Sequence, residues 1–283
     1  DSQAMSAKTI IVTRPSGQAR QLIEVLSHHI ENSGVAKRTL PEILSLPLLT
    51  IIPKSDEQLA DQIATILGNA DLAIFVSPNA IESVMRLLER DWQDFSKKII
   101  PIGVMGGSSQ LALKNHAIGL EQTPTPIIIP KDNDNWDSEG LWAELSKTIS
   151  DWKGKKILFL KGAGGREWLG EQFLNHGAEI YQVSTYRRVP LATDAPAWQS
   201  LEKLNPKEVA CLITSSEALQ HMVDVFKQQS SWTKEWFNLA TMICSHERIA
   251  KTARDAGFKQ VELCAAGDQN LLTASQRWLE QIK

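Results

Sequence analysis

Short runs of isoleucine, valine and leucine alternate with amphipathic stretches along almost the whole chain, and this alternation constrains the fold most strongly. Most of the runs are continuously apolar, which is typical of parallel strands covered by helices on both faces. Strands and helices that alternate in this way predict an α/β fold with parallel sheets. The expected strands span residues 9–13, 72–77, 99–104, 126–129, 156–160, 180–186, 209–214, 239–244 and 260–264.

Helix signals occupy the intervening segments. Ser55 and Gln58 form a capping box ahead of an apolar stripe that ends at Gly68. A helix that opens near Arg166 is expected to bury Trp168. Further helices are expected over residues 80–89, 248–256 and 271–282.

Composition narrows the class of protein. The 283 residues are 42% hydrophobic and 22% charged, which excludes disordered and collagen-like chains. At roughly 150 residues per domain, two domains are expected. The net charge is −3 and no basic run occurs, which argues against nucleic-acid binding. No apolar stretch approaches the roughly 20 residues that a membrane-spanning helix needs.

The cysteines and the first residues indicate a compartment. Cys211, Cys244 and Cys264 show no CxxC spacing, and the first two lie in apolar runs, as buried thiols of a reducing compartment do. Residues 1–8 lack the charged and apolar regions of a secretory signal. We therefore expect a cytoplasmic protein, and the residues before Met5 are left out of the fold argument.

Weak internal similarity suggests two related halves. Residues 8–15 resemble 155–162, residues 76–80 resemble 214–218, and residues 104–111 resemble 243–250. Three matches at nearly the same spacing are more than chance similarity between strand–helix units readily gives.

The usual cofactor and metal motifs are incomplete. Residues 162–167 follow a strand and open a helix, yet Glu167 stands where a dinucleotide fingerprint needs its third glycine. The chain has neither a GK[ST] phosphate loop nor a G-x-S-x-G elbow, and its six histidines show no metal-ligand spacing. No cofactor and no metal are therefore expected.

What remains is a series of strand-to-helix junctions rich in glycine and hydroxyl side chains. At the carboxyl edge of a parallel sheet, backbone N–H groups and helix dipoles attract anions. Two such edges facing each other across a hinge would bind a large polyanion, although any single junction is equally explained as a helix cap. The junctions span residues 13–17, 77–79, 106–109, 161–166, 214–216 and 245–247.

Taken in order, these motifs resemble the uroporphyrinogen-III synthase family over nearly the whole chain. The resemblance rests on residues 12–15, 75–81, 162–167, 177–186 and 214–216. It implies an enzyme without cofactor or metal that closes hydroxymethylbilane, a linear tetrapyrrole, into uroporphyrinogen III. Ring D is inverted and water is lost, through azafulvene and spiro intermediates.

The resemblance also implies the domain organisation: two flavodoxin-like, doubly wound parallel-sheet domains joined by two extended linkers. Proline-punctuated segments at 40–48 and 183–190 read as crossings between domains. The expected division is a discontinuous domain of residues 8–38 and 193–283, an inserted domain of 54–182, and linkers of 39–53 and 183–192.

Site residues follow from the resemblance. Tyr186 matches the proton donor of the family, although a tyrosine that only packs there remains an alternative. Substrate contacts are expected from Ser77 and Ser215, from Ser108, and from Arg14, for which pairing at its helix start is equally open. The remaining expected substrate contacts are Gly162, Gly164, Arg166 and Ser245. Glu247 stands where the family usually has threonine, which puts a direct role at that position in doubt.

Two other functions stay open at this stage. A hinged two-domain protein could bind an anionic ligand without catalysis, although a periplasmic clamp would carry a signal peptide. A nucleotide-dependent transferase would need a metal pair, and only Asp132 and Asp134, in a polar loop, come near one. A small-molecule substrate, a monomer, and substrate handed over by hydroxymethylbilane synthase are expected, with neither nucleic acid nor membrane as partner.

Overall fold

The structure is a computed structural model that describes residues 7–32, 40–96, 98–120, 125–131, 137–164, 168–229 and 231–281. The chain forms two compact units. Unit 1 consists of Asp1–Thr50 and Val189–Lys283, and unit 2 of Ile51–Arg188. Each unit has its own sheet with helices packed on both faces, so the predicted α/β class with doubly wound parallel sheets is confirmed.

Unit 1 contains a five-stranded sheet in the order β11-β10-β9-β1-β2, with every neighbouring pair parallel. Numbered along the chain, this order is 2-1-3-4-5, the flavodoxin-like arrangement. Its strands are β1 (Thr9–Val12), β2 (Glu42–Ser45), β9 (Val209–Ile213), β10 (Thr241–Cys244) and β11 (Gln260–Leu263).

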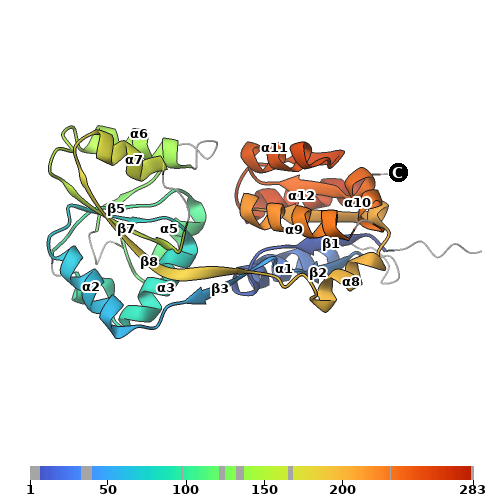
Figure 1. The fold of residues 1–283 in the computed structure, drawn as a ribbon, viewed down its shortest axis with the longest axis horizontal. Coiled ribbons are helices and arrows are strands. Elements are labelled where there is room, and N and C mark those ends of the chain that lie inside the picture. Colours follow the sequence, from blue (N-terminus) through green and yellow to red (C-terminus); the bar gives the residue numbers. More distant parts are fainter. Residues whose placement is uncertain are drawn as a thin grey trace, which may run out of the picture. The chain divides into compact units, whose positions relative to one another are not determined.

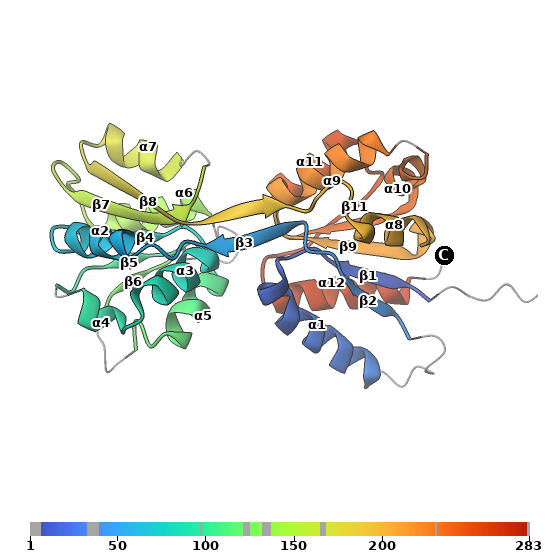
Figure 2. The ribbon, with the colours of Figure 1, turned by 60° about the horizontal axis from the view of Figure 1, so that its bottom comes forward.

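The helices of unit 1 form two layers, because successive strand residues point to opposite faces of the sheet. On one face α1 and α12 cover Ile10 and Val12, and on the other α8 to α11 cover Ile11 and Cys211. Figure 2 shows α1 and α12 on one side of this sheet and α9 and α11 on the other. The helices are α1 (Ser16–Glu31), α8 (Pro196–Glu202), α9 (Ser216–Gln228), α10 (Thr233–Leu239), α11 (Glu247–Ala256) and α12 (Asp268–Glu280), with a 3-10 turn at Pro206–Glu208.

Unit 2 contains a six-stranded sheet in the order β3-β8-β7-β4-β5-β6. If β7 is counted as the first strand, β8 as the second, and β4, β5 and β6 as the third to fifth, the order from β8 to β6 is again 2-1-3-4-5. Unit 2 is therefore a circularly permuted relative of unit 1. Its strands are β3 (Leu49–Pro53), β4 (Leu72–Phe75), β5 (Ile102–Gly103), β6 (Ile127–Ile128), β7 (Lys156–Gly162) and β8 (Glu179–Pro190).

Helices also cover both faces of the second sheet. Residues of α2 to α5 pack against Ala73 and Phe75 of β4, whereas α6 and α7 pack against Leu72 and Ile74 of the same strand. Figure 1 shows α2 and α3 on one side and α6 and α7 on the other. The helices are α2 (Glu57–Leu67), α3 (Pro78–Leu88), α4 (Trp92–Phe95), α5 (Gly107–Asn115), α6 (Ser138–Thr148) and α7 (Trp168–Asn175).

The internal similarities fall on equivalent strands of the two sheets. Residues 8–15 contain β1 and residues 155–162 contain β7, and each strand is second from the same end of its 2-1-3-4-5 order. The other two matches lie mainly at the junctions that follow equivalent strands, β4 and β9 in one case and β5 and β10 in the other. The sequence similarity therefore marks a structural repeat.

The two segments expected to be extended linkers are largely β-strands. Within 39–53, β2 belongs to the sheet of unit 1, and within 183–192, β8 continues to Pro190. The amide of Leu191 donates to Leu48 O at 2.9 Å, and that of Lys54 to Thr185 O at 2.9 Å. These two bonds show that β3 and β8 run in opposite directions. The prolines interrupt the apolar pattern that marks a strand in the sequence, but the strands still pair with their neighbours in the sheets.

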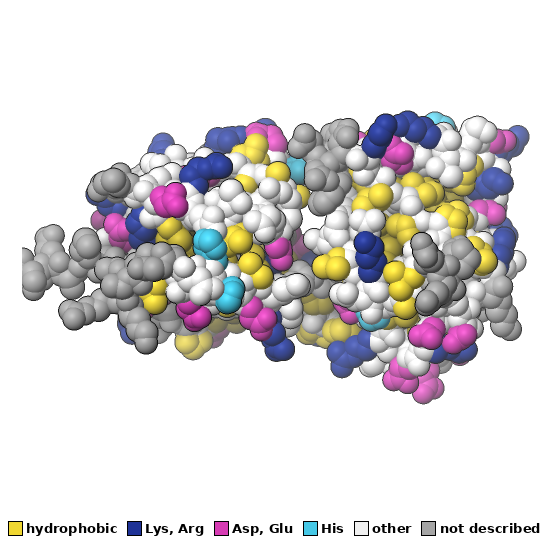
Figure 3. All heavy atoms as spheres, turned by 180° about the vertical axis from the view of Figure 1, so that it is seen from behind, with side chains coloured by type: hydrophobic (Ala, Val, Ile, Leu, Met, Phe, Trp, Pro, Cys, Tyr) yellow, Lys and Arg dark blue, Asp and Glu magenta, His cyan; other side chains and the backbone are white. Residues whose placement is uncertain are grey.

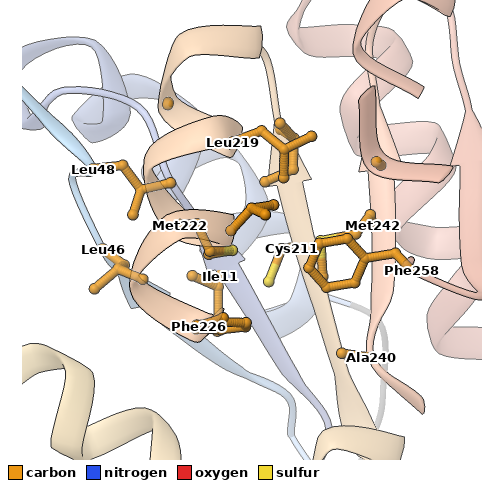
Figure 4. Close-up of a cluster of buried hydrophobic side chains, with 14 of the residues drawn as sticks. Ile11, Leu46, Leu48, Cys211, Leu219, Met222, Phe226, Ala240, Met242 and Phe258 are labelled. Carbon is orange, nitrogen blue, oxygen red and sulfur yellow. The ribbon is translucent and has the colours of Figure 1, made fainter. Parts of the chain in front are cut away.

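Leu46 and Leu48, which belong to the first predicted linker, lie in the core of unit 1. Figure 4 shows both beside Ile11, Met222 and Phe226. Leu46 is 1% exposed and Leu48 fully buried. Burial of a leucine side chain contributes roughly 1.5–3 kcal/mol to the free energy of unfolding. Residues 46 and 48 therefore stabilise unit 1, in addition to connecting it to unit 2.

Three further sequence predictions are wrong in detail. The cap of α2 is Asp56, whose carboxylate accepts from Gln58 N at 2.9 Å, and not Ser55. Leu239, expected in a strand, ends α10. Trp168, expected to be buried, is 39% exposed. The cap thus lies one residue later than expected, and β10 begins only at Thr241.

The surface has no large field of one charge on the face that Figure 3 shows, where acidic and basic side chains of the described residues are interspersed. This mixture agrees with the net charge of −3. Within the described residues, no helix is both long and apolar enough to cross a membrane.

Candidate functional site

Tyr186 and Ser77 meet at the carboxyl edge of the sheet in unit 2. Ser77 follows β4 and begins α3, and its hydroxyl oxygen lies 2.8 Å from that of Tyr186, with which it shares a hydrogen bond. The same serine oxygen accepts from Ala80 N at 3.2 Å and so caps α3. Tyr186 is 3% exposed. Two of the predicted site residues, 109 positions apart in the chain, are thus in direct contact.

Gly162 lies directly against the ring of Tyr186. The two residues are partners across β7 and β8, next to a register shift at Lys161/Gly162. A Cβ on Gly162 would lie 2.7 Å from Cε2 of Tyr186 and 2.8 Å from Cζ. No side chain fits at that distance, so the tyrosine can occupy its place only because residue 162 is glycine.

Thr185 and Ser83 fix β8 to α3 just beneath this pair. Both side chains are buried, and their hydroxyl oxygens are 2.7 Å apart. Ser83 also donates to Ala80 O at 3.1 Å. Buried polar groups that are all bonded hold their elements in one arrangement, so this contact sets where Tyr186 emerges from the strand.

The start of α5 offers backbone N–H groups at the same sheet edge. Its cap position is Gly106, and within the described residues no side chain caps it. Ser108, an expected substrate contact, is exposed in the first turn, whereas Ser109 is buried. An uncapped helix start with an exposed hydroxyl is suited to a carboxylate.

The loop after β7 is only partly described. Gly164 has φ of +75°, the left-handed conformation that favours glycine, and among the described residues no atom lies within 4 Å of the place where its Cβ would be. Arg166 lies outside the described residues.

In unit 1, Arg14 forms a structural ion pair. Its Nη1 is 2.6 Å from Asp268 Oδ1, at the first residue of α12, and the two side chains are 15% and 38% exposed. Beside it, Thr13 donates to Leu212 O at 2.7 Å. Arg14 is thus paired, but at the start of α12 rather than at the start of α1, the helix that follows it.

Ser215 and Ser245 lie at the ends of neighbouring strands of unit 1. Ser215 accepts from Ala218 N at 3.2 Å and caps α9, as Ser77 caps α3. At α11 the cap is His246, whose Nδ1 accepts from Arg248 N at 3.0 Å. Ser245 is half-buried and its amide donates to Ile213 O.

Glu247, where the sequence departs from the family pattern, forms an ion pair with Arg254 along α11. Both side chains are exposed. The carboxylate is thus occupied by a partner on its own helix.

The chemistry of the two edges is that of hydroxyl and N–H groups. Among the described residues, no cluster of three His, Cys, Asp or Glu side chains could hold a metal ion. Burial raises the pKa of the Cys211 thiol, and it raises the pKa of Cys244 to about 12. Both thiols stay protonated near neutral pH, so neither is a nucleophile. The side chain at this edge that could donate a proton is therefore Tyr186, whose phenol contacts Ser77.

Sequence reasoning missed Arg188 and the Ser83–Thr185 pair. The guanidinium of Arg188 donates from Nη2 to Ala163 O at 3.3 Å, next to Gly162. A signal was available for the arginine, because residues two apart on a strand share a face and Arg188 follows Tyr186 by two. No local pattern marks Ser83, which meets Thr185 only through the fold.

The chain is similar to known proteins of one family. A family model described as uroporphyrinogen-III synthase HemD matches residues 33–267. The uroporphyrinogen-III synthase of Escherichia coli (strain K12) is 28% identical over 274 residues, which cover 93% of this chain and 98% of the relative. That of Salmonella typhimurium is 27% identical over 271 residues, with the same coverage.

Solved structures show the same fold. A mutant uroporphyrinogen III synthase from the extremely thermophilic bacterium Thermus thermophilus superposes with a TM-score of 0.59 at 13% identity, covering 97% of this chain and 100% of that one. The synthetase from Helicobacter pylori 26695 gives 0.57 at 13% identity, with 96% and 99% covered. At such identities the likeness concerns the fold alone.

Proposed function

Since the chain belongs to the uroporphyrinogen-III synthase family, a family of cyclising lyases in tetrapyrrole biosynthesis, we propose that it closes hydroxymethylbilane to uroporphyrinogen III with inversion of ring D and loss of water. The observation that carries this proposal is the contact of Tyr186 with Ser77 at the carboxyl edge of unit 2. It supports the proposal because the phenol, as the proposed proton donor, contacts the start of α3, where a helix dipole suits an anionic substrate.

The first chemical step is loss of the hydroxyl on ring A. Tyr186 transfers its phenolic proton to the leaving oxygen, the carbon–oxygen bond breaks, and water and an azafulvene cation form. The phenolate that remains accepts a hydrogen bond from Ser77, which lies at the positive end of α3. Stabilising charge where it develops lowers the barrier of the step.

The second step decides the isomer. The substituted carbon of ring D attacks the azafulvene and gives a spiro intermediate, which fragments and recloses with the ring inverted. The proton lost from ring D on closure restores the phenol, directly or through solvent. Positioning contributes up to roughly 7–11 kcal/mol in favourable intramolecular reactions, so it outweighs a single proton transfer here.

Substrate binding relies on backbone and hydroxyl groups. Each pyrrole ring carries an acetate and a propionate, and we propose that the start of α5, with Ser108, binds one of these carboxylates. Gly164, Ser215 and Ser245 remain proposed contacts at the edges of their own units. Arg14, being paired with Asp268, would have to exchange that partner for a substrate carboxylate.

The proposal is tested by supplying fresh hydroxymethylbilane and separating isomers I and III by chromatography. The protein should yield isomer III, whereas buffer alone yields the symmetrical isomer I. Tyr186→Phe should lower kcat roughly 100-fold while leaving isomer III as the product, since positioning remains. Tyr181→Phe is the matched control, because Tyr181 bonds only Glu179 among the described side chains and should retain wild-type kcat.

Two outcomes would count against the proposal. An isomer mixture identical to that of buffer would exclude catalysis, and hydroxymethylbilane bound without conversion would indicate a binding protein. Unchanged kcat in Tyr186→Phe would remove that residue from the donor role.

A cytoplasmic location, a monomeric state and handover of substrate from hydroxymethylbilane synthase are further parts of the proposal. Light scattering of the purified chain tests the oligomeric state, since a monomer should give 31.5 kDa. Handover predicts that the coupled reaction releases less isomer I than the same enzymes separated by a dialysis membrane.

A further inference from the structure

We propose that Arg188 is a positioning residue that, together with Gly162, holds the phenol of Tyr186 where it donates its proton. This inference rests on the proposed function, because only that reaction makes Tyr186 a donor. It assigns Gly162 to the tyrosine rather than to the substrate.

The ring of Tyr186 approaches the backbone of Gly162 very closely. Cε2 and Cζ of Tyr186 lie 2.7 and 2.8 Å from the point that a Cβ on this glycine would occupy. Real Cβ atoms are essentially never found so close to another heavy atom. The ring therefore rests on the backbone of β7, and its hydroxyl reaches Ser77 from there.

The guanidinium of Arg188 also lies close to this point. Its Nη1 is also 2.8 Å from the position of that Cβ, and its Nη2 donates to Ala163 O at 3.3 Å. The guanidinium carbon is 6.0 Å from the centroid of the Tyr186 ring. One planar group thus touches the backbone of β7 and lies beside the phenol.

Together these contacts restrict the rotation of the Tyr186 side chain. A tyrosine has two side-chain torsions, and here three groups limit them. The backbone of Gly162 lies close to Cε2 and Cζ, the guanidinium of Arg188 lies over the ring, and Ser77 bonds the hydroxyl. Lysine cannot replace this arrangement, because an ammonium on a flexible stem lacks the planar fork of arginine. Displacement of a reacting group by about 1 Å can cost roughly 100-fold in rate.

The kinetic test compares Arg188→Ala and Arg188→Lys with Arg187→Ala, the matched control, whose side chain is exposed. Both changes at position 188 should lower kcat roughly 10- to 100-fold with little effect on KM, and Arg187→Ala should retain both constants. Full activity in Arg188→Lys would show that charge alone matters and would overturn the positioning role. So would a large rise in KM with kcat unchanged, which indicates direct substrate binding.

A spectroscopic test follows the phenol itself. The chain has only two tyrosines, so tyrosine labelled with ¹³C at Cζ gives two signals, which Tyr181→Phe assigns. In Arg188→Ala the Tyr186 signal should shift or broaden while that of Tyr181 stays in place. An unchanged Tyr186 signal would overturn the proposal even if activity fell.

Gly162→Ala perturbs the same ring from the backbone of β7. Its control is Gly68→Ala at the end of α2, where the nearest atoms to a Cβ are 3.4 and 3.7 Å away. Gly162→Ala should reproduce the kinetic and spectroscopic effects of Arg188→Ala, and a wild-type result would overturn the proposal. If Gly162→Ala does not fold, Arg188→Ala still decides. Absence of isomer III from the wild type would defeat the proposed function, whereas the ¹³C signals would still test the contact.

Discussion

At the residue scale, Ser77 combines a structural and a chemical contact in one oxygen atom. It accepts from Ala80 N as the cap of α3 and shares a hydrogen bond with Tyr186. A hydroxyl has two lone pairs and one hydrogen, so both contacts can exist together. Loss of the hydroxyl therefore affects stability and catalysis at once, and a control must separate them.

Ser77→Ala should cost about 1 kcal/mol in the free energy of unfolding, the usual effect of losing a cap, and should lower kcat about tenfold. Asp56→Ala removes the equivalent cap of α2, an exposed carboxylate that accepts from Gln58 N, and should lose similar stability with unchanged kcat. Denaturant unfolding and isomer III formation measure the two effects. Equal kcat in both variants would leave the Ser77 contact without a catalytic role.

Tyr181 should titrate above the ordinary range of tyrosine. Its hydroxyl donates to Glu179 Oε2 at 2.9 Å, and this hydrogen bond raises its pKa, aided by burial and by the carboxylate charge. Because the pKa is raised in the folded state, the stabilisation is present below the unfolded pKa and is lost as the pH rises through the folded one. The ¹³Cζ signal should give a midpoint above about pH 10, which Glu179→Gln should lower; equal midpoints would contradict the assignment.

The sequence could identify most of these residues separately, yet it could not join them. Ser77 was recognisable as a junction residue and Tyr186 through the family resemblance. Their contact spans 109 positions and depends on the register of β7 with β8, which includes an irregularity at Gly162. Arg188 stayed unnoticed because its partners are the backbone of another strand and a ring.

At the element scale, the prediction found the buried strand β9 and the edge strand β11, but it did not find β2. The expected strand at 209–214 matches β9, whose residues are all buried. In contrast, β2 has exposed ends and half-buried central residues, and prolines flank it. Pairing to β1 holds such a strand in place, and pairing leaves no mark in local hydrophobicity.

The part played by this segment can be measured with Leu46→Ala. Leu46 is 1% exposed and packs in the core of unit 1, so its truncation should cost about 2–5 kcal/mol in the free energy of unfolding. Leu263→Ala, at a side chain that is 50% exposed, should change stability by under about 1 kcal/mol. If Leu46→Ala lost no more free energy of unfolding than Leu263→Ala, residues 39–53 would act only as a linker.

Thiol reactivity tests the core strands β9 and β10. Burial raises the pKa of Cys211 and also, to about 12, that of Cys244, so both thiols are protonated at about pH 8. A thiol reagent at this pH should leave them unmodified in the native protein and react with all three cysteines after unfolding. Cys264 is half-buried and should react slowly, since its pKa is raised too. Rapid labelling of Cys211 in the native state would refute this packing.

At the scale of the whole molecule, the repeat in the sequence marked equivalent strands without giving the order of the units. Strand β1 of unit 1 matches β7 of unit 2, which comes later in the chain. Strand β9 of unit 1 matches β4 of unit 2, which comes earlier. Only a circular permutation reconciles the two directions, and three short matches could not distinguish it from a simple duplication. The sheet order supplies that distinction.

The discontinuous unit 1 should fold without its insertion. Leu48 and Leu191 are joined by a backbone hydrogen bond of 2.9 Å, so the two chain breaks of unit 1 lie on neighbouring, oppositely directed strands. Replacing 51–188 by an Asn-Gly turn converts these strand ends into a hairpin. Because the sheet of unit 1 and both helix layers remain, the shortened chain should unfold cooperatively in denaturant. Leu46→Ala should lower its stability by the same roughly 2–5 kcal/mol as in the full chain. A shortened chain with helical circular dichroism but no cooperative transition would show that unit 1 depends on unit 2 for its packing.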